Sequence, residues 1–384
     1  MYLPNYEENS IVNLVSTIAD SLGIKTGYQG LKSFDKKALN TRNVVLIIVD
    51  GLGYEWLLKK AKNSFIAENL QNKLTSVFPS TTATAIPAFM TGKPAQQHGL
   101  TGWYVFLKEL GVVSMILPFI SRVKGSRFHG SSDIAKTILT EKSLFEDFQR
   151  DCYQLLPKEI ARSDFTIKHK GKAKIVDYTN PCLLSFFHQL QNITEESGKK
   201  FVYAYWSWYD HLCHEFGPDS ELAFEHFQDL DNKLERFIKK LAGKDVTLLI
   251  TADHGFIQAE HKIDLKDHPK LKECLVMPLS GESRVAYCYV KPNKTKQFEQ
   301  YVKEKLENFC HLYKSSELIE KNFFGLGKPH PKLQDRIGDF VLIMKEGCVL
   351  KDALMDESAE FMEGYHGGVS KEEMWVPLSV IRSS

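Results

Sequence analysis

The stretch Val44-Val-Leu-Ile-Ile-Val49, followed at once by Asp50-Gly-Leu-Gly53, decides the fold class. An unbroken apolar run rich in β-branched residues is typical of a strand buried on both faces, as in a parallel sheet covered by helices. Similar runs occur at residues 201–206, 246–251 and 375–381. Helical patterns lie between them, notably from Ser220 to Leu241. Strands that alternate with helices predict a layered α/β fold.

The chain of 384 residues contains no repeat and no Pro/Gly/Ser-rich linker, so we expect a single catalytic α/β domain over residues 1–384. Residues 105–199 mix short apolar pieces with a basic run at residues 168–174, and we expect this divergent region to cap the site in part. The basic run is interpreted as a solvated face, with a contact to a substrate anion as the alternative. Residues 259–361 read as strand, helix and strand, which predicts an α+β insertion over one edge of the core.

Composition and charge exclude several classes of protein. Hydrophobic residues make up 43% of the chain and charged residues 25%, which is typical of a globular protein. The net charge of +1 provides no general attraction for a nucleic acid polymer or an anionic membrane. We find neither a secretory leader nor an apolar stretch long enough to span a membrane. The seven cysteines are scattered, without a disulfide framework or a CxxC pair, so we expect a cytoplasmic protein.

Polar side chains follow two of the predicted strands directly. Asp50 follows residues 44–49, and Asp253 with His254 follows residues 246–251. In open α/β sheets, ligands bind beyond the carboxyl ends of the strands, so these side chains are expected to share one crevice. The Asp50-Gly51 pair alone is weak evidence of a site, because an Asp-Gly turn commonly ends a strand. The Asp253-His254 pair is stronger evidence, because a carboxylate and an imidazole are both metal ligands.

A further Asp/His pair follows the strand predicted at residues 201–206. Asp210 and His214 are four residues apart, so one helical turn places both side chains on one face, as in helical zinc-binding pairs. An ordinary surface Asp–His pair is the alternative. His211 and Cys213 point elsewhere on such a turn, which indicates packing or support of the ligands.

Two more motifs carry candidate site residues. Ser80, Thr81 and Thr82 precede an alanine-rich segment and are helix N-cap types, and a hydroxyl at a helix start lies where N–H groups favour anions. His366 lies among glycines in Gly364-Tyr-His-Gly-Gly368, which leaves its ring free to reach inward. His98, in Gln97-His-Gly99, is interpreted as a structural histidine that closes the loop after the helix.

Taken in order, these motifs resemble the alkaline phosphatase superfamily. The local forms FPSTT, TGKPAQQHG, DHLCHEFGP and TADHG are most similar to its nucleotide pyrophosphatase and type I phosphodiesterase branch. The resemblance extends from about residue 44 to residue 380 and is weak over residues 105–199 and 259–361. It implies an alkaline-phosphatase-like layered fold, with a mostly parallel central sheet, helices on both faces and an α+β insertion.

The resemblance also implies the roles of the site residues. One metal ion would be held by Asp50, Asp253 and His254 together with the nucleophilic hydroxyl. A second would be held by Asp210, His214 and His366. In the family the nucleophile precedes the threonine of a Thr-Gly pair by nine residues, which selects Thr82. Mixed Asp/His ligation fits two divalent ions, zinc first, with manganese as the alternative.

The chemistry of these residue types agrees with such a site. A threonine hydroxyl is a weak nucleophile at neutral pH, and a coordinated cation lowers its pKa. Two cations about 4 Å apart clamp the attacking and leaving oxygens of an in-line displacement on phosphorus. Together with the resemblance, this predicts a metal-dependent phosphodiesterase or nucleotide pyrophosphatase. It would hydrolyse a small-molecule organophosphate diester, a nucleotide being one candidate, through a phospho-threonine intermediate.

Departures from the family pattern keep alternatives open. The animal enzymes of this branch carry an asparagine three residues after the nucleophile, where this chain has Ala85, so nucleotide specificity does not follow. A phosphomonoesterase or phosphonate hydrolase of the same fold is the first alternative, although no basic residue lies in the Thr82 motif. A non-catalytic binding member is the second. No sulfatase motif lies near Thr82.

Overall fold

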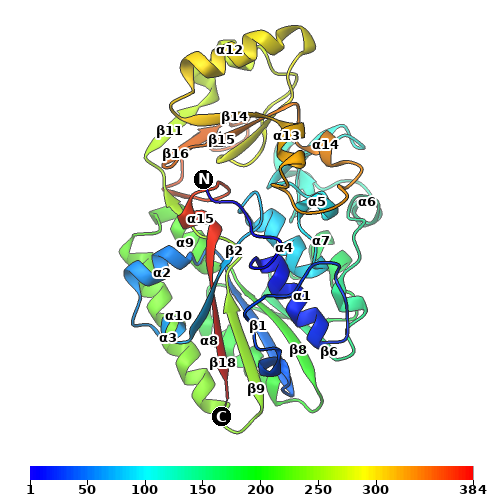
Figure 1. The fold of residues 1–384 in the computed structure, drawn as a ribbon, viewed down its shortest axis with the longest axis vertical. Coiled ribbons are helices and arrows are strands. Elements are labelled where there is room, and N and C mark those ends of the chain that lie inside the picture. Colours follow the sequence, from blue (N-terminus) through cyan, green and yellow to red (C-terminus); the bar gives the residue numbers. More distant parts are fainter. Residues whose placement is uncertain (384) are drawn as a thin grey trace.

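The computed structural model describes residues 1–383, which build two seven-stranded sheets. The first sheet forms the lower half of the molecule in Figure 1 and has the strand order β2-β18-β9-β1-β8-β6-β7. Its strands are β1 (Asn43–Val49), β2 (Leu70–Thr75), β6 (Asp151–Pro157), β7 (Lys174–Tyr178), β8 (Lys200–Trp206), β9 (Val246–Thr251) and β18 (Trp375–Arg382). The four apolar runs of the sequence are therefore strands of one sheet, as predicted.

The direction of β18 differs from that of the other strands. The pairs of β1 with β8 and β9, and of β6 with β7 and β8, are parallel, whereas β18 runs antiparallel to β9 and β2. The chain enters β18 from the loop at residues 364–370, which already lies beyond the carboxyl ends of the parallel strands. From there, the chain enters the sheet in the direction opposite to that of the parallel strands, which makes β18 antiparallel. The sheet is thus mostly parallel, as expected, with one reversed strand.

Helices cover both faces of the first sheet (Figure 1). On one face, α1 (Ile11–Ser21) packs against α4 (Thr82–Thr91), which α5 (Ala95–His98) follows. On the other, α10 (Glu221–Lys240) packs against α3 (Phe65–Glu68), α8 (Leu183–Glu195) and α9 (Trp208–Phe216), while α2 (Tyr54–Lys60) contacts β18. The helix predicted near residues 220–241 is α10; it begins after Ser220, whose hydroxyl accepts a hydrogen bond from the Ala223 N–H.

Side-chain alternation along β8 divides its residues between the two faces. Trp206 packs against Phe186 of α8, with ring centroids 5.3 Å apart. Tyr203 faces the opposite side, where its ring centroid lies 6.4 Å from that of Phe89 in α4. Because successive side chains in a strand point to opposite faces, Tyr205 lies on the α4 side with Tyr203.

The second sheet is antiparallel and lies above the first in Figure 1, with the order β14-β15-β13-β12-β3-β4-β5. Its strands are β3 (Tyr104–Leu107), β4 (Val112–Met115), β5 (Ile120–Ser121), β12 (Ser280–Gly281), β13 (Val285–Cys288), β14 (Cys310–Lys314) and β15 (Phe340–Met344). The strands within residues 105–199 are thus divided between the two sheets. The description of this region as a cap, and of residues 259–361 as an insertion, stays a prediction.

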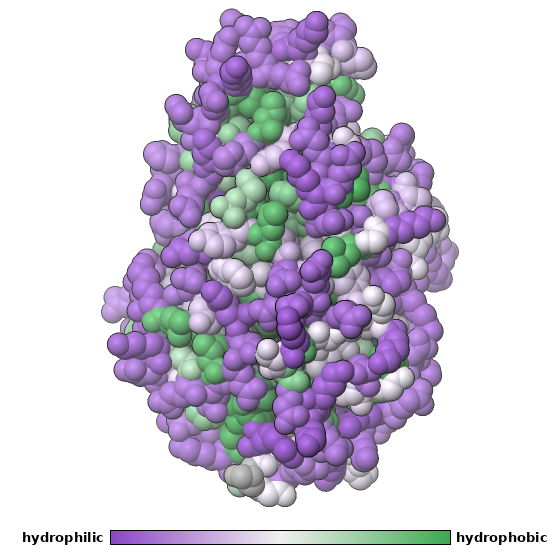
Figure 2. All heavy atoms as spheres, viewed as in Figure 1, coloured by the Kyte–Doolittle hydropathy of each residue, from purple (hydrophilic) through white to green (hydrophobic). Residues whose placement is uncertain are grey.

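The remaining elements are short or peripheral. Two-stranded sheets pair β10 (Ile257–Gln258) with β17 (Gly364–Tyr365) and β11 (His261–Asp264) with β16 (Cys348–Lys351). The other helices are α6 (Ser131–Ile138), α7 (Asp164–His169), α11 (Pro269–Lys272), α12 (Thr295–Lys305), α13 (Ser315–Glu320), α14 (Leu333–Arg336) and α15 (Lys371–Met374). Within residues 1–383, no helix combines the length and the apolar character that crossing a membrane requires. On the face in Figure 2, hydrophilic side chains predominate and apolar ones form separate patches.

A buried ion pair joins the second sheet to the loop that carries His366. The Arg284 guanidinium donates from Nε and Nη2 to the two carboxylate oxygens of Glu373, at 2.8 and 2.7 Å. Both side chains are almost fully buried, and the Gly368 N–H donates to the same carboxylate at 2.8 Å. Although burial alone would raise it, the pKa of Glu373 is held below its ordinary value by Arg284.

We expect Arg284→Met to lower the free energy of unfolding by about 3–5 kcal/mol, because it leaves the Glu373 carboxylate buried without its counter-charge. Lys239→Met is the matched control: it breaks the exposed ion pair with Glu235, whose net contribution is below about 0.5 kcal/mol. Urea unfolding measures both variants. Equal stability of the two would contradict a stabilising role for the buried pair.

Candidate active site

Three neighbouring strands deliver the acidic residues of the site. β1 lies between β8 and β9, and all three run in the same direction. Their carboxyl ends therefore meet at one edge, where Asp50 follows β1, Asp253 follows β9, and Asp210 lies on α9 just after β8. Gly51 turns the chain away with φ of 78°, and a Cβ there would lie only 2.4 Å from the Phe256 ring. The Asp-Gly turn therefore directs the chain away from the site directly after Asp50, in a conformation and a space that favour glycine.

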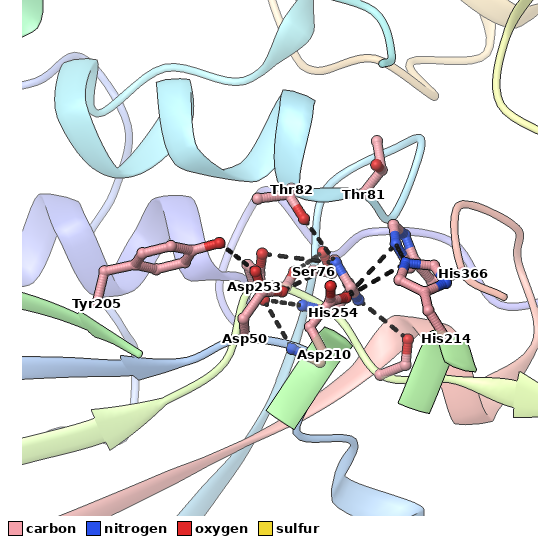
Figure 3. A network of polar contacts seen from close by, with 12 residues as sticks. Asp50, Ser76, Thr81, Thr82, Tyr205, Asp210, His214, Asp253, His254 and His366 are labelled. Atoms are coloured by element: carbon pink, nitrogen blue, oxygen red, sulfur yellow. Dashed lines mark hydrogen bonds and ion pairs between the residues drawn. The ribbon is translucent and has the colours of Figure 1, made fainter. Parts of the chain in front are cut away.

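Asp50, Asp253, His254 and Thr82 form the first group of side chains (Figure 3). The His254 Nε2 atom lies 3.4 Å from Asp50 Oδ1 and 3.5 Å from Asp253 Oδ2. The Thr82 Oγ1 atom lies 3.0 Å from the same nitrogen. Potential ligand atoms of Asp50, Asp253 and His254 are close enough to hold one metal ion.

Asp210, His214 and His366 form the second group, directly beside the first. The Nε2 atoms of His214 and His366 are 3.1 Å apart, and they lie 3.5 and 3.7 Å from Asp210 Oδ1. Asp210, His254 and His366 are also close enough to hold one ion, and the rings of His254 and His366 stack at 3.7 Å. The structure thus brings together all seven residues that the resemblance implies, with His254 between the two groups.

Backbone carbonyls orient two of the histidines. His254 Nδ1 lies 3.1 Å from the Gly255 carbonyl oxygen, and His214 Nδ1 lies 2.9 Å from that of Gly364. A carbonyl can only accept a hydrogen bond, so each Nδ1 carries a proton and each Nε2 faces the site. Such hydrogen bonds are the usual way in which a protein holds a metal-binding imidazole. Burial, the largest cause, lowers the pKa of His214 to about 4 and keeps it neutral.

The carboxylates of Asp50, Asp210 and Asp253 are buried and repel one another, and a bound cation would offset this repulsion. Asp50 Oδ1, Asp210 Oδ1 and Asp253 Oδ2 are buried without a hydrogen-bond partner, and within residues 1–383 the only ion-pair partners of these groups are histidines. Burial, followed by repulsion from Asp210 and Asp253, raises the pKa of Asp50 well above its ordinary value. Burial also raises the pKa of Asp210 to about 7. This donor set fits divalent metal ions.

Of the two labelled hydroxyls at the start of α4, that of Thr82 faces the acidic groups, while that of Thr81 points away (Figure 3). Ser80 donates to the Gly368 carbonyl oxygen at 2.8 Å. Thr81 occupies the N-cap position of α4, but its side chain makes no capping hydrogen bond. The Thr81 hydroxyl therefore does not cap the helix, although threonine is a common residue type at this position.

The neighbouring histidines and Cys213 have other environments. His98 is buried, its Nε2 lies 3.1 Å from the Thr84 carbonyl oxygen, and its Nδ1 accepts the Leu100 N–H at 3.0 Å. Neither nitrogen of His98 is free for a metal, in agreement with a structural role. His211 is exposed and packs on the Trp208 ring, with centroids 4.3 Å apart. Cys213 lies on the buried side of α9.

Two supporting residues were not foreseen. The Tyr205 hydroxyl donates to Asp50 Oδ2, and the Ser76 hydroxyl donates to the Asp253 backbone carbonyl. Tyr205 is the next-to-last residue of a mostly apolar strand, and a tyrosine at that position is the signal that could have identified it. Ser76 precedes the Val77-Phe-Pro79 segment and carries no such signal.

Comparison with known proteins defines the class to which the chain belongs. It is a member of the type I phosphodiesterase / nucleotide pyrophosphatase family, whose description matches residues 44–368. Ectonucleotide pyrophosphatase/phosphodiesterase family member 5 of Homo sapiens is 29% identical over 174 residues, which are 42% of this chain and 32% of that protein. The match therefore spans about a third of the length of that curated relative.

Solved structures show the same fold. Murine ectonucleotide pyrophosphatase/phosphodiesterase 5 superimposes with a TM-score of 0.66 at 22% identity, covering 88% of this chain and 87% of that one. Phosphonoacetate hydrolase from Sinorhizobium meliloti 1021, in complex with phosphonoformate, gives 0.63 at 18% identity over 88% and 90% of the two chains. The predicted alkaline-phosphatase-like α/β fold is thereby confirmed.

The raised pKa of Asp210 has a testable consequence for the metal-free protein. A carboxyl with a pKa near 3.8 when unfolded and about 7 when folded binds protons more tightly in the folded state, so stability falls as pH rises from about 4 to about 7. We expect metal-free Asp210→Asn to melt at least about 2 °C above the metal-free wild type at pH 8, and by a smaller margin at pH 5.

Added divalent metal should reverse this order. It should raise the melting temperature of the wild type at pH 8 and affect Asp210→Asn much less, because a ligand is lost. Thermal unfolding with chelator and with metal, at both pH values, measures the effect. A metal-free Asp210→Asn protein less stable than the wild type at pH 8 would refute the electrostatic interpretation.

Proposed function

We propose that the protein is a metal-dependent phosphodiesterase or nucleotide pyrophosphatase that hydrolyses small organophosphate diesters through a phospho-threonine intermediate at Thr82. The observation that carries this proposal is the position of Thr82 Oγ1, 3.0 Å from His254 Nε2 and beside both Asp/His groups. Family membership supports the reaction class. An inactive variant of the murine relative, in which a threonine is replaced by alanine, was crystallised with AMP, which is consistent with a threonine nucleophile.

The residues would divide the work as follows. Asp50, Asp253 and His254 would hold one divalent ion, and Asp210, His214 and His366 the other, with zinc favoured by the mixed Asp/His ligands. When bound, these ions supply Lewis-acid stabilisation of the alkoxide and of the phosphoryl oxygens. Tyr205 and Ser76 position Asp50 and Asp253 by hydrogen bonding.

The protein groups then carry the displacement. Thr82 Oγ1 attacks phosphorus, the P–O bond to the first alcohol breaks in line, and the phosphoryl group becomes covalently attached to Thr82. The N–H groups of Thr82 and Ala83 belong to the first turn of α4, where a helix offers them no carbonyl, and they would donate to the non-bridging oxygens. Ala85 is buried and offers no donor, so these backbone groups replace the asparagine of the animal enzymes. Attack by water on phosphorus releases the monoester and restores the hydroxyl.

The charge around the site favours a diester over a monoester. A monoester carries an additional negative charge that a phosphatase commonly neutralises with arginine or lysine. Among the described residues that line the cavity at Thr82, Arg127 is the basic residue other than histidine, and it is exposed. Arg284 lies nearer to the His366 loop but is already paired with Glu373.

Phosphonate hydrolysis is the second candidate, because phosphonoacetate hydrolase shares the fold and was crystallised with phosphonoacetate. The cavity beside Thr82 has a volume of about 610 Å³, which is within the usual range for drug-sized ligands. This volume favours a substrate with an organic group larger than the acetate of phosphonoacetate. A cytoplasmic location, expected from the scattered cysteines of the sequence, stays a prediction.

We expect the purified protein to hold two divalent metal ions per chain and to lose hydrolysis of bis(4-nitrophenyl) phosphate on chelation. Asp210→Ala and His366→Ala should each empty the same metal position, whereas His98→Ala should retain both ions. Elemental analysis and crystallography of the variants measure this. An active preparation without metal, or loss of different ions from the two ligand variants, would show the assignment to be wrong.

Thr82→Ala should fold normally and lose activity by at least about a thousandfold, because the covalent route is removed while metal ligands and positioning remain. Thr82→Ser should keep measurable activity, since its hydroxyl can still attack. Thr81→Ala and Ser80→Ala are the matched controls and should cost far less.

Mass spectrometry of the trapped phospho-enzyme locates the modified residue. A phosphoryl group on Thr81, or loss of activity in Thr81→Ala with Thr82→Ala active, would overturn the assignment. Rates on a nitrophenyl diester, a nitrophenyl monoester and phosphonoacetate separate the candidate reactions, and no turnover of any of them would favour a non-catalytic member.

A further inference from the structure

The turn between β12 and β13 of the second sheet carries two charged residues toward the active site. β12 ends at Gly281 and β13 begins at Val285, so the turn consists of Glu282, Ser283 and Arg284. The Glu282 N–H donates to the Val285 carbonyl oxygen at 2.8 Å, which closes the turn. Arg284 forms a buried ion pair with a carboxylate of another loop. Glu282 is therefore the charged side chain of the turn whose function is still open.

The Glu282 carboxyl holds the main chain at Trp103. The Trp103 N–H donates to Glu282 Oε1 at 2.5 Å. The next residue, Tyr104 of β3, pairs with Gly281 of β12, so the two segments are neighbours in the second sheet. Trp103 lines the cavity beside Thr82. Glu282 thus fixes part of the cavity wall through a backbone hydrogen bond.

The same carboxyl contacts the residue directly before the nucleophile. The Thr81 side chain, which points away from the acidic groups in Figure 3, hydrogen-bonds to Glu282. This bond gives the Thr81 hydroxyl a partner outside α4, in agreement with its failure to cap that helix. Because one planar peptide unit joins Thr81 to Thr82, a fixed Thr81 restricts where the Thr82 hydroxyl can lie.

Glu282 also lies against the loop that carries His366. A Cβ at Gly367, whose φ is 106°, would lie 3.1 Å from Glu282 Cβ and Cγ, closer than an ordinary van der Waals contact. The carbonyl oxygen of the next residue, Gly368, accepts the Ser80 hydroxyl at 2.8 Å. The loop that precedes α4 and the loop of His366 are therefore joined twice, once directly and once through Glu282.

The surroundings of Glu282 do not favour a carboxylate that serves stability alone. The residue as a whole is partly exposed, but burial of its carboxyl raises its pKa to about 7, while hydrogen bonds from the Trp103 N–H and the Thr81 side chain act in the opposite direction. Arg284 is paired elsewhere, and within residues 1–383 Glu282 forms no ion pair. A desolvated carboxyl without a counter-charge costs free energy, which favours a role in the site.

We propose that Glu282 is a positioning residue for the nucleophile Thr82, because it joins Thr81 to the loop of His366 and to the cavity wall. The proposal rests on the proposed function, in which Thr82 is the attacking group. Glu282 does not touch the reacting atoms, so it acts on the alignment of Thr82 Oγ1 for in-line attack. A displacement of about 1 Å in such a group lowers a rate by about a hundredfold.

Two conservative variants test the alignment in the metal-loaded enzyme with bis(4-nitrophenyl) phosphate. Glu282→Asp keeps the charge, but its side chain is one methylene shorter and cannot reach both Thr81 and Trp103. We expect its kcat to fall at least about tenfold, with KM within about threefold of the wild type. Glu282→Gln keeps the length and an acceptor oxygen, and its kcat should stay within about threefold of the wild type.

Ser283→Ala is the matched control in the same turn and should leave kcat unchanged. Elemental analysis should find the same metal content in all of these proteins, because Glu282 contacts no predicted ligand side chain. A Glu282→Gln enzyme slower than Glu282→Asp, or loss of metal from Glu282→Asp, would overturn the positioning role.

A double variant tests the route through Thr81. Thr81→Ala alone should lower kcat by about threefold, far less than Thr82→Ala. Thr81→Ala combined with Glu282→Asp should be no slower than Glu282→Asp alone, because both changes break the same connection. Losses that multiply would show that Glu282 does not act through Thr81 and would overturn the proposal.

Crystal structures of the metal-loaded wild type and Glu282→Asp test the positioning without reference to turnover. We expect Thr82 Oγ1 to shift by at least about 0.5 Å relative to His254 Nε2, while the Asp/His ligands keep their places. Such a shift in a protein that hydrolyses no ester would reject the proposed function and support the positioning role. An unshifted Thr82 would overturn the positioning role and leave the hydrolase function intact.

Discussion

The mutual repulsion of three buried carboxylates is the constraint on which the rest of the site depends. Asp50, Asp210 and Asp253 meet because three adjacent parallel strands end at the same edge of the sheet. Lysine and arginine form no ion pair with them in the described part of the chain. Burial of like charges costs several kcal/mol unless protons or cations compensate, and a donor set of carboxylates and imidazoles fits a divalent metal ion in that role.

Hydrogen bonds around the carboxylates orient the potential ligand atoms of the histidines and of Asp50 toward the site. Backbone carbonyls hold the Nδ1 protons of His214 and His254, so the Nε2 atoms face inward. Tyr205 satisfies one oxygen of Asp50 and leaves the other without a partner. The loop that carries His366 is fastened by Glu373, which Arg284 of the second sheet neutralises. Both sheets therefore contribute to the position of one ligand set.

The features that depend on residues close together in the sequence could be predicted from the sequence alone. Apolar runs identified the strands of the central sheet, and the polar residues after them identified Asp50, Asp253 and His254, because strand ends in such sheets converge. The spacing of Asp210 and His214 identified α9. The reversed direction of β18, the support of Asp50 by Tyr205 and the assembly of the second sheet from residues 104–121 and 280–344 all depend on contacts between distant segments. The cavity beside Thr82 has the same origin, because its walls come from α4, α7, α9, β6, β8 and the loops near them.

The position of β18 between β2 and β9 governs when the fold can be completed during synthesis. In the strand order, β18 separates β2 from β9, so residues 70–75 have no neighbour in the finished sheet until residues 375–382 have left the ribosome. His366 lies only a few residues before β18 and emerges at nearly the same time. The growing chain thus carries an unpaired strand edge and an incomplete ligand set together, and a single late event, the docking of the C-terminal strand, closes both.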